Sequence, residues 1–136
     1  MVESSFKPSS PFSFKITPHF TYGEFCNQEE RRRFTAQHQC ETAKALAVFF
    51  ESLRTHFGKA VIITSGHRPS AVNQEVGGAP DSEHLYDKPW KGAVDVKVKD
   101  TAPLTVETWI EANWPLSVGL GQKKQRGFTH VGMRGD

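Results

Sequence analysis

Residues 93–98 read AVDVKV, a segment in which the side chains alternate in character. Successive side chains of a β-strand point to opposite faces, so Val94, Val96 and Val98 share one face. Asp95 lies on the opposite face. The segment therefore predicts a strand with an apolar face for the core and a carboxylate on its other side.

A second strand is predicted near the C-terminus, over residues 127–133, with His130 on one of its faces. If the two strands are neighbours in a sheet, Asp95 and His130 can point into one cleft. His84, in the loop before the Asp95 strand, can close over that cleft. Two imidazole nitrogens and one carboxylate oxygen suit Zn²⁺ and leave a fourth position open. Spacing alone favours the alternative without a metal, namely a hydrogen-bonded His84 in a loop, Asp95 at the surface and His130 on a strand.

A long amphipathic helix is predicted over residues 28–57. Asn27, followed three residues later by Glu30, resembles a capping box, and Gly58 is a typical helix end. Apolar residues then recur at three- and four-residue steps, at Ala36, Cys40, Ala43, Leu46, Ala47, Phe50, Leu53 and Phe57. The three arginines at 31–33 are expected on the solvated surface of this helix.

The remaining elements are short. A β-branched strand is expected at 60–64, a turn at 65–69, a short helix at 70–76 and another helix at 103–114. The inward residues of the last helix are predicted to be Leu104, Ile110 and Trp114. The length of 136 residues fits one domain, which we place over residues 21–136.

Residues 1–20 are expected to form an irregular arm. Four aromatic residues would pin this arm to the domain, namely Phe6, Phe12, Phe14 and Phe20. The arm has neither the basic region nor the apolar region of a signal peptide, so the protein is expected in the cytoplasm of the producing cell.

Charge and hydropathy exclude two classes of partner. The net charge of +2, from 17 basic and 15 acidic residues, is too small to indicate nucleic-acid binding. No segment approaches the roughly 18 to 20 apolar residues that span a bilayer. We therefore expect neither nucleic acid nor membrane as a partner.

Cys26 and Cys40 are expected to be free thiols. If one helix separates them, a rise of about 1.5 Å per residue places their Cα atoms nearly 20 Å apart. A disulfide requires less than about 7 Å.

Four local segments occur in an informative order. Residues 63–73 read ITSGHRPSAVN, 76–79 read VGGA, 82–85 read SEHL, and 92–95 read GAVD. The series closely resembles the M15 peptidases, which include zinc D-Ala-D-Ala carboxypeptidases, dipeptidases and phage L-alanyl-D-glutamate endopeptidases. Residues 127–131, GFTHV, resemble the strand that carries the third zinc ligand of that family.

This resemblance implies an α+β protein with the hedgehog/DD-peptidase fold, in which a long N-terminal helix packs on an antiparallel sheet. It implies zinc on His84, Asp95 and His130. It also implies that Arg68 contacts the substrate or the tetrahedral intermediate, a role that suits a permanently charged guanidinium. The alternative for Arg68 is a salt bridge that braces the turn. Ser82 is expected to orient its loop or to contact a substrate carboxylate.

The sequence departs from the family pattern in two places. His84 and Asp95 are eleven positions apart, where the family usually has seven, so residues 86–91 form a lengthened loop. The positions that hold the general base in the family are occupied by residues with no acid–base group, namely Gly127, Phe128 and Gly132. The loop offers three other carboxylates as candidates, at Asp81, Glu83 and Asp87.

The resemblance implies a monomeric zinc peptidase that cleaves peptidoglycan stem peptides, and a route to the cell wall such as the release of a phage-type lysin. The alternative is a zinc-containing binding module, as in the hedgehog signalling domain, because that scaffold binds its partners without catalysis.

Overall fold

The protein combines helices with two antiparallel sheets in a computed structural model that describes residues 6–78, 82–116, 118–119 and 128–133. In chain order these residues form β1 (Lys15–Thr17), β2 (Phe20–Thr21), α1 (Tyr22–Phe25), the 3-10 helix η1 (Glu30–Arg32), α2 (Gln37–Phe57), β3 (Val61–Ser65), α3 (Ser70–Glu75), the 3-10 helix η2 (Glu83–Leu85), β4 (Ala93–Val98), α4 (Pro103–Asn113), β5 (Val118–Gly119) and β6 (Thr129–Gly132). The α+β class is confirmed. Among the described residues, no helix combines the length and hydrophobicity that crossing a membrane requires.

The larger sheet positions the predicted ligands. Its strand order is β3-β4-β6-β5, with every neighbouring pair antiparallel. The two strands that the sequence predicted as neighbours, β4 and β6, are hydrogen-bonded to each other, with Asp95 directly opposite His130. On the other side of β4, Asp95 pairs with Ser65 at the end of β3, after an irregularity in the register.

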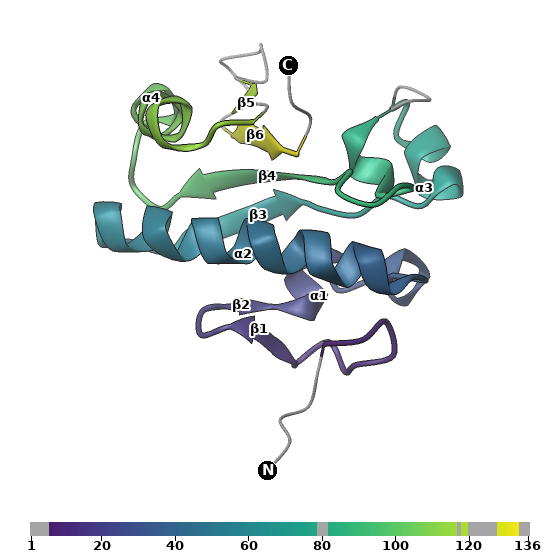
Figure 1. Ribbon diagram of the computed structural model, residues 1–136. Helices are drawn as coiled ribbons and strands as arrows, with labels where there is room; N and C mark the ends of the chain where they lie inside the picture. The colour runs from purple at the N-terminus through teal and green to yellow at the C-terminus, as the bar shows by residue number, and fades with distance from the viewer. Residues whose placement is uncertain (1–5, 79–81, 117, 120–127, 134–136) are drawn as a thin grey trace.

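The valine face of β4 is covered by α2 and α4. Val94 and Val96 are fully buried, in one hydrophobic core with Leu46 and Phe50 of α2 and Ile110 of α4. Figure 1 shows α2 running beside β3 and β4, with the β1–β2 hairpin on its other side. Because both helices contribute to the core on this face, the opposite face of β4 is left for its carboxylate.

The helix predicted over residues 28–57 is wrong at its N-terminal end, because α2 begins only at residue 37. Asn27 and Gln28 have left-handed backbone conformations, with φ of 52° and 58°, which a right-handed helix does not accommodate. The first turn of α2 is instead closed by Gln39, whose side-chain oxygen accepts hydrogen bonds from two backbone N–H groups just before the helix. The predicted end at Gly58 is confirmed, with φ of 63°.

The N-terminal arm packs on the core as its phenylalanines predicted. Phe6 and Phe20 are buried, and Phe12 and Phe14 are partly buried against the same core. The arm is not irregular throughout, however. The antiparallel pair β1–β2 forms within the part that was expected to lack regular structure.

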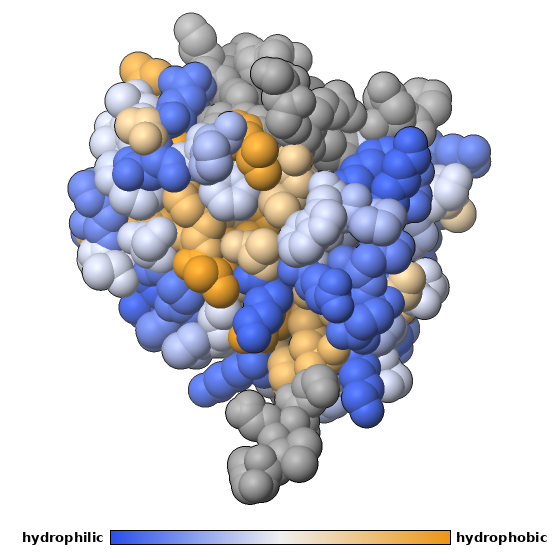
Figure 2. Space-filling view, viewed as in Figure 1, coloured by the Kyte–Doolittle hydropathy of each residue, from blue (hydrophilic) through white to orange (hydrophobic). Residues whose placement is uncertain are grey.

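The inward face of α4 differs from the prediction at one residue. Ile110 is fully buried, and the half-buried Trp114 donates a hydrogen bond from Nε1 to the Gly132 carbonyl over 2.8 Å. Leu104 is 65% exposed, since at about 100° per residue it lies roughly 200° around the helix from the buried Val106. Figure 2 shows apolar residues gathered toward the middle of this face, with mostly hydrophilic residues around them.

Both cysteines are free thiols, as predicted, and both are buried. The reason differs from the one the sequence suggested, since the helix that would separate them is interrupted. Burial raises the pKa of each thiol to about 12, so neither forms the reactive thiolate near neutral pH.

We therefore expect Cys26 and Cys40 to resist a thiol reagent in the folded protein and to react fully after unfolding without reductant. The reagent's absorbance before and after adding guanidinium measures this. An intact mass two hydrogens too light, restored by reduction, would contradict it.

Candidate metal centre

Asp95 and His130 are brought together by the register of two adjacent strands. They occupy directly opposed positions on β4 and β6, so their side chains lie on the same face of the sheet. The distance from His130 Nδ1 to Asp95 Oδ1 is 3.0 Å. The Asp95 side chain is nearly buried and that of His130 is 24% exposed, so one partner remains open to solvent.

His84 completes the group from η2. Its Nε2 lies 3.4 Å from the same carboxylate oxygen of Asp95, and its ring centroid is 5.2 Å from that of His130. One potential ligand atom from each residue lies within 4.8 Å of the others. In the part of the chain that the structure describes, these three residues (the His–Asp–His cluster) are the group that could hold a metal ion.

The orientation of His84 is determined by backbone contacts. Its Nδ1 lies 2.8 Å from the Gly66 carbonyl, and because a carbonyl only accepts, Nδ1 must carry the hydrogen. The lone pair is then on Nε2, the nitrogen that faces Asp95. The Arg68 N–H donates to the His84 carbonyl over 2.7 Å, and the Ser82 hydroxyl accepts a hydrogen bond from the His84 N–H over 3.1 Å. Ser82 therefore contacts the backbone of the candidate ligand His84.

The protonation of Asp95 suits a metal ligand. Burial favours the neutral carboxyl, but the hydrogen bond with His130 and the interaction with His84 outweigh that effect and lower the pKa of Asp95 to about 2. The carboxylate is therefore ionised throughout the neutral range. One anionic oxygen between two imidazole nitrogens is a donor set that fits Zn²⁺. The second hydrogen bond of His84, to a backbone carbonyl, is typical of histidines that ligate metals.

Arg68 lies close enough to the His–Asp–His cluster to interact with the charge of Asp95. Burial lowers the pKa of the Arg68 guanidinium, and the Asp95 carboxylate acts in the opposite direction. A guanidinium stays charged in proteins despite such shifts. Its Nε is buried and has no hydrogen-bond partner among the described residues. Arg68 is therefore a charged side chain near the candidate metal centre, with one buried donor, Nε, that no described residue satisfies.

Two of the positions that are expected to hold the general base lie among the described residues, and neither has a side chain that can accept a proton. Phe128 is half-buried and its side chain has no titratable group, while Gly132 has no side chain and its carbonyl accepts from Trp114. Gly127 lies outside the described residues.

The loop carboxylates do not supply an obvious replacement. Asp87 forms an ion pair with Lys91 over 2.7 Å, and this hydrogen bond lowers the pKa of Asp87. A base held at low pKa is poorly matched to proton transfer near neutral pH. Asp81 and the side chain of Glu83 lie outside what the structure describes.

The lengthened loop over residues 86–91 is anchored at its start. Tyr86 is fully buried, and its hydroxyl donates to the Ala93 carbonyl over 3.0 Å. Its ring packs against those of Phe34 and His67. Tyr86 therefore ties the start of the loop to the hydrophobic core, while residues 87–90 are exposed.

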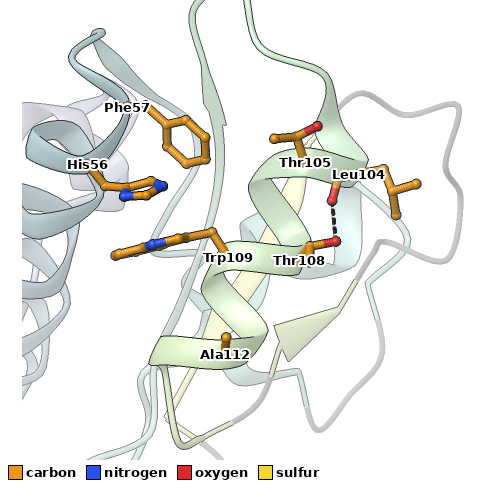
Figure 3. A pocket seen from close by; sticks show the side chains of 7 residues that line it. All are labelled: His56, Phe57, Leu104, Thr105, Thr108, Trp109 and Ala112. Atoms are coloured by element: carbon orange, nitrogen blue, oxygen red, sulfur yellow. Dashed lines mark hydrogen bonds between the residues drawn. The ribbon is translucent and has the colours of Figure 1, made fainter.

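An apolar pocket of about 530 Å³ lies elsewhere, between the end of α2 and α4 (Figure 3). Its lining includes Trp109, whose ring stacks against His56 at 4.7 Å and against Phe49 at 5.9 Å. None of its lining residues belongs to the His–Asp–His cluster. The pocket is therefore not part of the candidate metal centre.

The backbone contacts around His84 were not predicted from the sequence. Gly66 is 18 residues from His84 in the sequence. Asn27, whose side chain binds Gly66, is 39 residues from Gly66. A backbone carbonyl leaves no sequence signature, because every residue has one. The glycine itself was the available signal, since a side chain there would collide with the Phe25 carbonyl.

Comparison with known families gives one match. A family model described as Peptidase M15 matches residues 18–132, a range that includes the whole His–Asp–His cluster. No curated protein and no solved structure gives a significant match to the chain.

Proposed function

Because the chain belongs to the peptidase M15 family, we propose that it is a zinc-dependent peptidase that cleaves peptidoglycan stem peptides at amide bonds beside a D-residue. The single observation that carries this proposal is the convergence of His84, Asp95 and His130, with ligand atoms within 4.8 Å of one another. The family supplies the reaction class, and the cluster supplies a place where such chemistry can occur.

Three protein ligands suit a catalytic site better than a structural one, because structural zinc sites normally use four. Bound there, zinc would act as a Lewis acid that polarises the scissile carbonyl and activates water. Asp95 contributes the negative charge of the donor set, and the Gly66 carbonyl keeps Nε2 of His84 directed toward it.

Arg68 is the proposed stabiliser of developing negative charge. Its backbone N–H is hydrogen-bonded to the His84 carbonyl, so the arginine is tied to a ligand residue. Its guanidinium interacts with Asp95 and has a donor with no partner among the described residues. A permanently charged guanidinium near the cluster can stabilise the oxyanion of a tetrahedral intermediate.

The test is incubation of zinc-loaded protein with synthetic stem peptides, followed by mass spectrometry of the products. We expect cleavage at an amide flanked by a D-residue, loss of cleavage on chelation and recovery with added zinc. The matched control is the same peptide built from L-residues, which should remain intact.

A zinc-containing binding module is the second candidate, favoured by the lack of an acid–base group at Phe128 and Gly132. A missing general base is expected to cost about 10²- to 10⁴-fold, which leaves a slow enzyme and not an inert one. Zinc-loaded protein that binds purified sacculi but leaves every stem peptide uncut over long incubations would contradict the peptidase proposal and support the binding module.

A further inference from the structure

The turn that follows β3, at residues 66–68, contacts His84 of the candidate metal centre at two points. The Gly66 carbonyl accepts from Nδ1 of His84, and the Arg68 N–H donates to the His84 carbonyl. Gly66 therefore holds the ring of His84, and Arg68 holds its backbone. Any displacement of the turn would move His84 relative to Asp95 and His130.

Asn27 holds the other side of the same turn. Its side-chain oxygen accepts from the Gly66 N–H over 3.0 Å, and its side-chain nitrogen donates to the Thr64 carbonyl over 3.1 Å. Gly66 thus connects the two residues, because its carbonyl binds His84 and its N–H binds Asn27. The left-handed backbone of Asn27, with φ of 52°, is part of this arrangement, and asparagine tolerates that conformation better than most residues.

Arg32 and His67 form a reciprocal pair of hydrogen bonds. Nε of Arg32 donates to the His67 carbonyl over 2.8 Å, and Nδ1 of His67 donates to the Arg32 carbonyl over 2.6 Å. Arg32 is only 7% exposed, although the sequence placed it on a solvated helix surface. Burying a guanidinium is unfavourable unless specific contacts compensate. Its strongest contact here is a backbone carbonyl of the turn, and Glu29 lies at 3.8 Å.

Gly66 brings the two segments into direct contact. A Cβ at this position would collide with the Phe25 carbonyl, and the next residue, His67, donates its N–H to that same carbonyl over 2.7 Å. The turn is therefore packed against residues 25–32 without an intervening side chain. Its position depends on that segment.

We propose that Asn27 and Arg32 support the metal centre as positioning residues for His84, acting through the turn at Gly66. This inference rests on the proposed metal function. Neither residue touches the ion site. Their effect is to keep the Gly66 carbonyl in place, which determines the ring orientation and tautomer of the ligand. Outer contacts of this kind typically change metal affinity by about 10- to 100-fold.

Two pairs of variants test the inference, each with a neighbour as its matched control. Asn27→Gly removes the contacts to the turn. Gln28→Gly removes a side chain at an equally left-handed position, φ 58°, which lies beside Gly23. Arg32→Met removes the buried arginine, and Arg31→Met removes an exposed one that pairs with glutamates at the surface.

Zinc affinity is measured by competition with a chelating dye, well below the unfolding temperature of each variant. We expect about 10-fold weaker binding or more for Asn27→Gly and Arg32→Met, with affinity unchanged in the two controls. The visible spectrum of the cobalt-substituted protein should change in the same two variants, because the geometry at His84 changes. A purely structural role would lower the unfolding temperature without altering either readout.

Affinities and cobalt spectra that match those of the controls in both variants would overturn this inference while leaving the proposed metal site intact. A wild-type protein that binds no zinc would overturn both. The two failures are therefore distinguishable.

Discussion

His84→Ala and His130→Ala should each lose most of the zinc that the wild-type protein holds, which we expect to be about one ion per chain. Each substitution removes one of two imidazole nitrogens from a three-residue set whose ligand atoms lie within 4.8 Å. The remaining histidine and Asp95 cannot supply enough ligands to compete with buffer or chelator. Elemental analysis after dialysis measures the loss, and peptide cleavage should disappear with the metal.

His56→Ala is the control for this experiment. His56 is exposed and stacks on Trp109, away from the His–Asp–His cluster. It should retain full zinc, which separates loss of a ligand from loss of any histidine. Full zinc in both His84→Ala and His130→Ala would refute the ligand assignment.

Arg68→Ala should lower turnover by about 10²- to 10³-fold while zinc remains bound, the usual consequence of removing one oxyanion donor. The arginine interacts with Asp95 through its charge but is not one of the clustered ligands. Steady-state kinetics on the cleaved stem peptide, with zinc content measured on the same sample, separates the two effects. We expect the loss mainly in kcat, because the donor acts on charge that develops in the transition state.

Two further variants test this interpretation, the conservative change Arg68→Lys and the control Arg31→Ala. Lysine keeps the charge without the planar fork of donors, so an intermediate rate is expected. Arg31 is exposed and paired with Glu29 and Glu75, so its loss should leave turnover unchanged. Full turnover in Arg68→Ala would favour the alternative role, in which the arginine only braces its turn.

Much of the site could be predicted because strand patterns are local. The alternation around Asp95 placed its carboxylate away from the valines, and the structure buries Val94 and Val96 in the core as that pattern requires. Pairing with His130 was a hypothesis about neighbouring strands, and the register confirms it.

The long helix shows where local reasoning fails. The capping signature at Asn27 was chemically reasonable, yet that side chain is used by the turn after β3. Phe34, which would have lain inside the helix, is buried at 2% exposure, and its N–H donates to the Tyr22 hydroxyl. These contacts join residues 12 to 39 positions apart, and a pattern read over a few helical turns does not contain them.

The sequence by itself therefore determined the α+β class, the apolar face of β4 and the identity of the three clustered residues, because side-chain alternation and motif order are properties of neighbouring positions. Only the tertiary structure decided that Asp95 and His130 are directly opposed, that a backbone carbonyl orients His84, and that Asn27 and Arg32 lie outside α2 and bind the turn that carries this carbonyl. The physical reason is that backbone groups are identical at every position. Which of them meet is decided when the core packs.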